Sequence, residues 1–188
     1  MGRTARLFVV SGPAGVGKGT LVSKVRERRP SIGLPVSATT RKPRPGEIDG
    51  VSYHFLSNDE FDARVEAGEF LEWAQVHTNR YGTLKCEVDA CLSRGDSVIL
   101  EIDMQGGQNV RKIYPDAVLI FIDPPSWDVL VQRLRGRGTE TEESLSVRLK
   151  TAERELALAH TYDVRIVNDD LEEAVCELER TIETFETE

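Results

Sequence analysis

The sequence has little cysteine and no long apolar run, and these shortages exclude several classes of protein. Its three cysteines, Cys86, Cys91 and Cys176, show no Cys-x-x-Cys spacing and no regular histidine partners. This pattern predicts free thiols in a reducing cytosol rather than a disulfide framework or a zinc site. The first apolar run ends at Val10 and is too short to span a membrane, and no signal-peptide cleavage region follows it. We therefore expect a cytoplasmic protein without a membrane partner.

Positive charge is also in short supply. The chain has 24 Lys and Arg against 32 Asp and Glu, which gives a formal net charge of −8. This balance argues against a protein that coats DNA or RNA, so we do not expect a nucleic-acid partner. A phosphate site needs only a few arginines, so local basic clusters still carry information. No repeat or low-complexity tract occurs, and 188 residues suffice for one domain that needs no disulfide or structural metal.

Short apolar runs that are rich in β-branched residues predict the strands of a parallel sheet. A helix predicted at about 19–29 follows the first run, and a helical apolar stripe at 171–185 is expected to close the core. Near-continuous apolar strands separated by helical patterns are typical of an α/β fold with helices on both faces of the sheet. The predicted strands are 7–10, 97–102, 117–122 and 164–167.

Two segments depart from this pattern and predict additions to the core. The first has a loop at 42–46 with two prolines and a glycine, half-exposed strands at 51–55 and 70–77, and a helix near 58–66. We interpret it as an inserted lobe of mixed strands and helix. The second, at 133–148, is polar and charged and contains two glycines, which predicts an arm that joins two helices.

A glycine-rich segment after the first predicted strand has the spacing of a P-loop. Its glycines allow consecutive backbone N–H groups to surround a phosphate, the following helix N-terminus adds partial positive charge, and Lys18 adds a full charge. Gly19 stands where the usual motif has a Mg²⁺-binding Ser or Thr, and Thr20 comes one residue later, so direct contact between Thr20 and a metal stays open. A P-loop alone predicts a nucleotide and not a reaction. The residues are Gly12, Pro13, Ala14, Gly15, Val16, Gly17, Lys18, Gly19 and Thr20.

Arg41 and Arg44 lie three residues apart on the proline-stiffened loop. Both guanidinium groups can therefore converge on one phosphate, whose oxygens suit the paired donors of arginine. An isolated pair with this spacing is more often two solvated arginines on a charged loop, so the surrounding residues must decide between the two interpretations.

Those surrounding residues resemble the guanylate kinase family of P-loop nucleoside monophosphate kinases. The resemblance runs from the first strand to the last helix in the family's order. It implies a P-loop NTPase-type parallel sheet core with an inserted mixed α/β GMP-binding lobe and a helical lid. The implied division is one domain, 1–188, with a core at about 1–34, 97–125 and 156–188, a lobe at about 35–96 and a lid at about 126–155. The matching strings are 37–47, 50–55, 68–74, 80–83, 101–106, 123–126, 137–140 and 167–170.

The resemblance also implies the reaction ATP + GMP = ADP + GDP, an in-line phosphoryl transfer with Mg²⁺ that belongs to purine nucleotide metabolism. ATP and GMP, and possibly dGMP, are then the small-molecule substrates. Asn168 is implied to contact the adenine of ATP, and the glycine-rich segment its phosphates. The phosphate of GMP is assigned to Arg41, Arg44, Tyr53 and Tyr81, and its base to Ser37, Glu72, Thr83 and Asp103. The catalytic set is Lys18, Arg41, Arg133, Arg137 and Arg148, and the metal set, through water, is Thr20 and Glu101.

The chemistry of the bases agrees with this assignment. Guanine offers an acceptor at O6 and donors at N1 and N2, so a hydroxyl donor and a carboxylate acceptor suit it. Adenine would meet such a site donor against donor, and a buried site that leaves polar groups unpaired rejects the wrong base strongly.

Several alternatives remain at this point. Glu101 stands where the family commonly has Asp, and it is either a ligand of metal-bound water or the partner of an arginine. Asn168 can also cap the last helix. As a whole, the chain can be a P-loop kinase for another small phosphorylated substrate, or a catalytically silent guanylate kinase-like module that binds phosphopeptides. The sequence does not indicate the oligomeric state.

Overall fold

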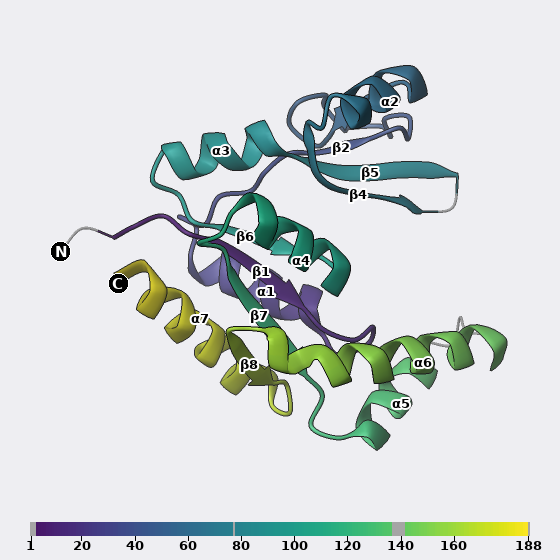
Figure 1. Ribbon diagram of the computed structural model, residues 1–188, viewed down its shortest axis with the longest axis vertical. Coiled ribbons are helices and arrows are strands. Elements are labelled where there is room, and N and C mark those ends of the chain that lie inside the picture. Colours follow the sequence, from purple (N-terminus) through teal and green to yellow (C-terminus); the bar gives the residue numbers. More distant parts are fainter. Residues whose placement is uncertain (1–2, 77, 137–141, 188) are drawn as a thin grey trace.

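A four-stranded parallel sheet forms the centre of the molecule (Figure 1). The computed structural model describes residues 3–76, 78–136 and 142–187. The strand order is β6-β1-β7-β8, so β1 lies inside the sheet next to β7. These strands confirm the four predicted runs to within one residue at most ends. They are β1 (Leu7–Ser11), β6 (Val98–Glu101), β7 (Val118–Asp123) and β8 (Val164–Val167).

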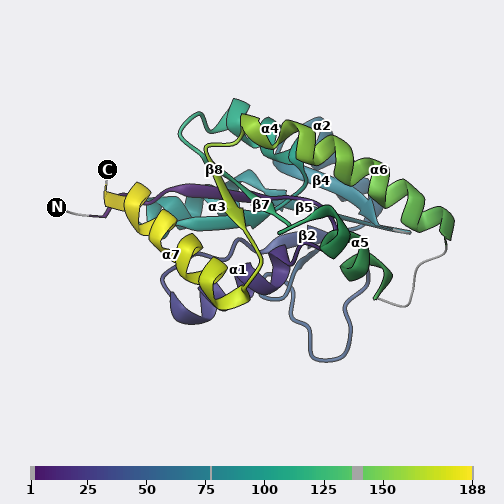
Figure 2. The same ribbon diagram turned by 90° about the horizontal axis from the view of Figure 1, so that it is seen from below.

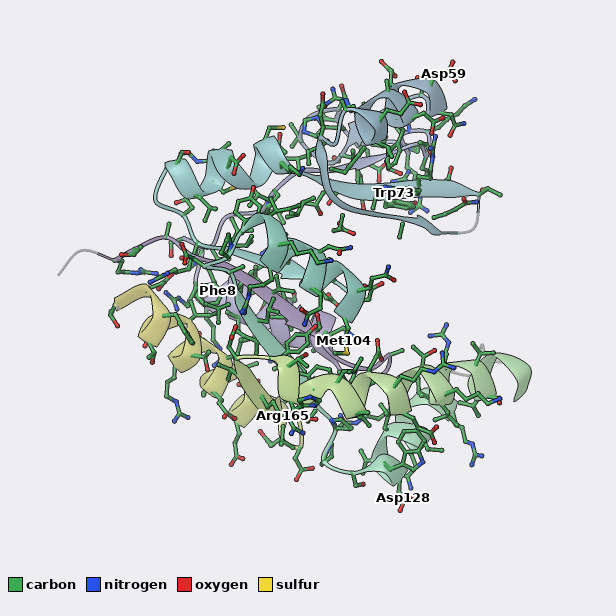
Figure 3. All side chains as sticks on the ribbon, viewed as in Figure 1. Phe8, Asp59, Trp73, Met104, Asp128 and Arg165 are labelled. Atoms are coloured by element: carbon green, nitrogen blue, oxygen red, sulfur yellow. The ribbon has the colours of Figure 1, made fainter. Side chains whose placement is uncertain are left out.

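Both faces of this sheet are covered by helices, as the fully buried strands β1 and β7 require. Figure 2 shows α1 (Lys18–Arg28) and α7 (Leu171–Thr187) on one side and α4 (Met104–Ile113) on the other. Alternate residues of β1 serve the two cores: Phe8 packs with α1 and α7, and Val9 packs with α4. In Figure 3 Phe8 and Met104 lie inside the molecule, whereas Asp59 and Asp128 project from its surface.

The inserted lobe has its own sheet, in the order β3-β2-β5-β4. A small separate core of Ala38, Phe61, Phe70 and Leu84 joins this sheet to α2. The predicted helix at 58–66 is confirmed as α2, which begins with a capping box between Ser57 and Glu60. The elements are β2 (Ser37–Thr39), β3 (His54–Phe55), α2 (Asn58–Glu66), β4 (Phe70–Val76), β5 (Asn79–Leu84) and α3 (Lys85–Ser93), which leads back to β6.

The predicted strand at 51–55 is wrong over most of its length. Only His54 and Phe55 form β3, because the residues before them make a turn. Gly50 has a φ of 73°, and the N–H groups of Val51 and Ser52 both donate to the carbonyl of Ile48. The predicted strand at 70–77 is β4, which ends at Val76; residue 77 lies outside the described residues.

The predicted arm corresponds to two helices at the end of the molecule opposite the lobe (Figure 1). They are α5 (Trp127–Arg135) and α6 (Glu142–Leu158), and a short 3-10 turn, η1 (Ala159–Thr161), follows. The connection at 137–141, which includes Arg137, lies outside the described residues. α6 continues three residues past the predicted lid boundary at 155.

Candidate active site

The glycine-rich loop, residues 12–17, connects the carboxyl end of β1 to the N-terminus of α1. Its shape depends on glycine at two positions. Gly12 has a φ of 148°, and a Cβ there would overlap the carbonyl oxygen of Ile122. Gly17 has a φ of 98° and is the N-cap of α1, where no side chain caps the first turn. The first N–H groups of the helix are therefore left for an anion.

Lys18 places its charge on this loop. Its Nζ donates to the carbonyl oxygens of Gly12 at 2.6 Å and Pro13 at 3.1 Å. The lysine side chain therefore folds back over the loop, and its ammonium group lies beside the backbone that would surround a phosphate.

Asn168 braces the same loop from the end of β8. Its Nδ2 donates to the carbonyl of Val16 at 2.7 Å, and the residue is 5% exposed. Asp170 instead caps α7, since its Oδ1 accepts from the N–H groups of Glu172 and Glu173. The alternative that Asn168 caps the last helix is therefore wrong.

Arg133 of α5 joins this arrangement. Its Nη1 donates to the carbonyl of Asn168 at 3.1 Å, so one predicted catalytic arginine lies beside the residue that braces the loop. Arg148 is half-buried on α6, and Arg137 lies outside the described residues.

Oxygen donors lie beside the start of α1. The Oε2 of Glu101, at the end of β6, is 3.2 Å from the position that a Cβ on Gly19 would occupy, and Thr20 follows directly. A carboxylate and a hydroxyl are donors that suit Mg²⁺. No arginine in the described ranges pairs with Glu101. Within the same ranges, no group of three or more His, Cys, Asp or Glu side chains could hold a metal ion by itself.

Three predicted base-contacting residues form one row across the sheet of the lobe. Thr83 on β5 lies opposite Ser37 on β2 and opposite Glu72 on β4. Directly opposed residues share a face of the sheet, and the Oγ1 of Thr83 donates to Oε1 of Glu72 at 2.7 Å. The register of the strands therefore brings these three side chains together.

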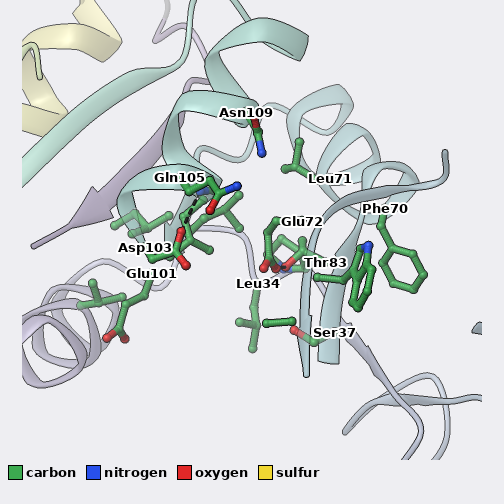
Figure 4. A pocket seen from close by; sticks show the side chains of 18 of the residues that line it. Leu34, Ser37, Phe70, Leu71, Glu72, Thr83, Glu101, Asp103, Gln105 and Asn109 are labelled. Carbon is green, nitrogen blue, oxygen red and sulfur yellow. Dashed lines mark hydrogen bonds between the residues drawn. The ribbon is translucent and has the colours of Figure 1, made fainter. Parts of the chain in front are cut away.

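This row lines a cavity of about 750 Å³ between the lobe and the central sheet. Figure 4 shows Glu72 and Thr83 on the lobe side, with Asp103 and Gln105 on the opposite wall. Asp103 is the N-cap of α4, and its Oδ1 accepts from the N–H of Gly106 at 2.7 Å. The second carboxylate oxygen is not used by this cap.

The electrostatics of the cavity affect Glu72 most. Burial raises the pKa of Glu72, and the negative charge of Asp103 raises it further, while hydrogen bonds from Thr83 act in the opposite direction. The result is a carboxylate that pairs well with donors of a ligand, because it gains little from water when the cavity is empty.

The arginine loop, residues 41–47, holds two of the four predicted phosphate-binding residues, Arg41 and Arg44. The guanidinium of Arg41 lies 5.4 Å from the ring centroid of Tyr53, whose ring is 6.1 Å from that of Tyr81. Arg44 is exposed on the same loop. The structure thus brings Arg41, Tyr53 and Tyr81 together.

Sequence reasoning missed one member of this loop. Glu47 forms a two-point ion pair with Arg41, with N–O distances of 2.8 and 2.9 Å. The available signal was a glutamate three residues after Arg44 and six after Arg41, a spacing that a tight loop can close.

No helix in the described part of the chain combines the length and the apolar character needed to cross a lipid bilayer.

Comparisons with known proteins agree with the sequence resemblance. The sequence model of the guanylate kinase family matches residues 4–185. A guanylate kinase from Synechococcus sp. (strain CC9311) is 51% identical over 179 residues, which cover 95% of this chain and 94% of that protein. One from Nocardia farcinica is 52% identical over 177 residues, covering 93% and 91%. The crystal structure of guanylate kinase from Anaplasma phagocytophilum superposes with a TM-score of 0.72 at 30% identity, covering 100% of this chain and 89% of that one.

Proposed function

The chain belongs to the guanylate kinase family, and on that premise we propose that its glycine-rich loop binds ATP while its inserted lobe binds GMP. The enzyme transfers a phosphoryl group from ATP to GMP and forms ADP and GDP. The assignment of GMP to the lobe rests on one observation: the row of Ser37, Thr83 and Glu72 faces Asp103 across the cavity.

On the ATP side, the phosphates would lie against the backbone N–H groups of residues 12–20, with Lys18 adjacent. Asn168 already gives its Nδ2 to Val16, so its Oδ1 is the atom left to accept from the adenine amino group. Mg²⁺ bound with ATP would neutralise charge on the phosphates, and Thr20 and Glu101 would hold it, through water in the case of Glu101.

On the GMP side, the Glu72 carboxylate would accept from guanine N1 and N2, while Ser37 and Thr83 supply hydroxyls and Asp103 a second carboxylate. The GMP phosphate would lie among Arg41, Arg44, Tyr53 and Tyr81, the first of which lies over the ring of Tyr53 and interacts with the side chain of Tyr81. Because Ser37, Thr83, Glu72 and Asp103 give the cavity hydroxyls and carboxylates, the proposed site favours guanine over adenine.

The transfer itself needs positive charge and alignment more than a proton acceptor. A phosphate monoester has a second pKa near 6, so the attacking oxygen of GMP is largely ionised at neutral pH. No general base is required. The two anions must be brought together, and we assign this task to Lys18 and to a set of arginines that lie on the lobe and on the lid, residues 126–155. These arginines are Arg41, Arg133, Arg137 and Arg148.

We further propose that the lobe, 35–96, and the lid move toward the core when both substrates are bound, because an open site must admit substrates and a closed one must exclude water. The small separate core of the lobe supports movement as a unit. We place the enzyme in the cytoplasm and in purine nucleotide metabolism. GMP and dGMP both fit this proposal.

The experiment is a measurement of ADP release with ATP plus GMP, with AMP, CMP and UMP as controls. We expect turnover with GMP and a loss of at least about a hundredfold in kcat/KM with the other three, because none of their bases offers Glu72 the adjacent N1 and N2 donors of guanine. Turnover of another phosphorylated substrate, or none with any nucleotide, would contradict the GMP assignment and favour a different kinase or a silent binding module.

A further inference from the structure

We propose that Glu47 is a positioning residue for the phosphate of GMP: its carboxylate orients the guanidinium of Arg41 so that one two-donor edge is kept for the substrate. This inference rests on the proposed binding of GMP by the lobe. It adds a residue to the arginine loop that phosphate chemistry alone does not suggest, because a carboxylate repels a phosphate.

The ion pair uses one particular edge of the guanidinium. Nη1 of Arg41 donates to Oε2 of Glu47 at 2.9 Å, and Nη2 donates to Oε1 at 2.8 Å. Nη1 also donates to the carbonyl of Lys42 at 2.8 Å. Both hydrogens of Nη1 and one of Nη2 are therefore engaged inside the loop.

The remaining donors form the second edge that arginine presents to anions. This edge consists of Nε–H and the other hydrogen of Nη2. The Tyr81 side chain also acts on this guanidinium as a hydrogen-bond acceptor, whereas the Nε of Arg41 has no carboxylate or carbonyl partner in the described part of the chain. The rings of Tyr53 and Phe55 lie 5.4 and 5.8 Å from the guanidinium carbon, so aromatic side chains also limit its movement. A phosphate can engage the second edge without breaking the pair with Glu47.

Glu47 is itself held in place independently of Arg41. Its Oε2 accepts from the backbone N–H of Arg44 at 2.7 Å, and its own N–H donates to the carbonyl of Arg44 at 3.0 Å. The Arg41 guanidinium, followed by the N–H of Arg44, lowers the pKa of Glu47 to about 2. The carboxylate is thus ionised at any pH at which the enzyme would work.

The two arginines of the loop therefore differ in how their charges are balanced. Glu47 neutralises Arg41, whose side chain is 14% exposed, while Arg44 keeps its charge on the surface. An exposed, flexible Arg41 would lose side-chain entropy when it bound a phosphate. Glu47 removes most of that loss before the substrate arrives, which is the benefit of preorganisation.

The test is steady-state kinetics of Glu47→Gln with GMP and ATP varied separately. We expect KM for GMP to rise about tenfold and kcat to fall by a smaller factor, since Arg41 is also assigned to the transfer step, while KM for ATP stays within about twofold of wild type. Glu47→Asp keeps the charge on a shorter side chain and should recover part of the loss. Glu69→Gln is the matched control, since it removes an exposed pair with Arg64, 2.9 Å long, in the same lobe, and should leave both KM values unchanged.

A double-mutant cycle separates positioning from a contact of Glu47 itself. Calorimetric titration with GMP alone should show that Glu47→Gln weakens binding in wild type but has little effect in an Arg41→Met background. An undiminished effect in that background would overturn the proposal. So would an unchanged or lower KM for GMP in folded Glu47→Gln, the lower value showing that the carboxylate competes with the substrate. Failure of wild-type enzyme to use GMP would instead reject the proposed function.

Discussion

The two regions that we propose bind anions are built from different parts of the chain. The glycine-rich loop presents backbone N–H groups between a buried strand and a helix. Its main-chain carbonyls accept hydrogen bonds from side chains, and one of these side chains, Asn168, holds the loop in place. The arginine loop presents side chains on an exposed segment of the lobe, held by Glu47. Backbone donors require glycine and close packing, whereas side-chain donors require a counterion to hold them. The proposed site would thus bind one phosphate through backbone N–H groups and the other through arginine side chains.

The largest effect is expected at Lys18, the first residue of α1, whose ammonium group lies on the glycine-rich loop. Lys18→Met keeps an aliphatic stem of similar length and removes the charge. We expect kcat to fall by at least about a hundredfold, as is usual when one positioned charge at the transition state is lost. Steady-state kinetics on a variant with an unchanged circular dichroism spectrum is the measurement; near-normal turnover would remove Lys18 from the mechanism.

The lobe should respond differently, with a loss confined to one substrate. Glu72→Gln keeps the shape of the side chain but removes its anionic acceptor. We expect GMP to bind more weakly by about 1–3 kcal/mol, with ATP affinity nearly unchanged. Equal weakening of both substrates, measured by calorimetry, would show that Glu72 has a structural role.

The dependence of kcat/KM for GMP on pH in the acidic range tests the same role of Glu72. Burial raises the pKa of Glu72, so the carboxylate takes up a proton at a higher pH than an exposed glutamate does. kcat/KM for GMP should therefore fall as the pH decreases through that raised pKa. In Glu72→Gln the corresponding step should be absent, and a profile identical to wild type would assign the step to another group.

A smaller effect is expected where a side chain supports the backbone of the glycine-rich loop. Asn168→Ala leaves the carbonyl of Val16 without its 2.7 Å hydrogen bond. An unpaired buried acceptor costs about 1–3 kcal/mol. We expect a rise of a few-fold in KM for ATP and a lower melting temperature, with KM for GMP unchanged; a change confined to KM for GMP would contradict the placement of Asn168 on the ATP side.

The smallest kinetic effect should follow a change that touches neither region. Glu186 is 2% exposed at the end of α7 and accepts from Arg3, Arg29 and Ser97, each at 2.6 Å. Glu186→Gln should lower the free energy of unfolding by about 1–3 kcal/mol, since it leaves the partly buried Arg29 and the exposed Arg3 without their anionic partner, while both KM values stay unchanged. A kinetic change would mean that loss of stability alone can mimic loss of a binding residue.

The pH dependence of that stability has a definite sign. Burial alone would raise the pKa of Glu186, but the hydrogen bonds from Ser97, Arg29 and Arg3 together lower it. A lowered pKa contributes stability above the unfolded value of about 4.3, and this contribution is lost as the pH falls through the folded pKa. Chemical denaturation should therefore show the wild type and Glu186→Gln converging in acid and separating at neutral pH.

The sequence predicted the fold best where local signals and tertiary burial agree. β8 was predicted at its observed bounds because its apolar residues are β-branched, and α2 was predicted at 58–66, where the structure adds a capping box between Ser57 and Glu60. α4 was not predicted, since Gly106 and Gly107 lower its helix propensity and its stability depends on packing against the sheet as well as on the Asp103 cap. β2 was missed because it is three residues long and lies beside a strand far away in the sequence.

The residues of the candidate site also fall into two groups: those that a local sequence pattern predicts and those that depend on tertiary contacts. The glycine-rich loop is visible in the sequence because backbone geometry restricts its residues. The roles of Ser37, Glu72 and Thr83 came from the family resemblance, since their proximity depends on strand register that no local pattern encodes. The contacts of Asn168 with Val16 and of Glu47 with Arg41 are tertiary pairings, which spacing permits but does not specify.

The row of Ser37, Thr83 and Glu72 has a consequence for how base preference can evolve. Each side chain comes from a different strand, and the strands are joined by main-chain hydrogen bonds that do not depend on the identity of the residues. A substitution of Ser37 can therefore alter one proposed recognition group while the other two, which are hydrogen-bonded to each other, keep their positions. Changes at Thr83 and Glu72 are instead coupled, so a new base preference at these two positions would require both to change together.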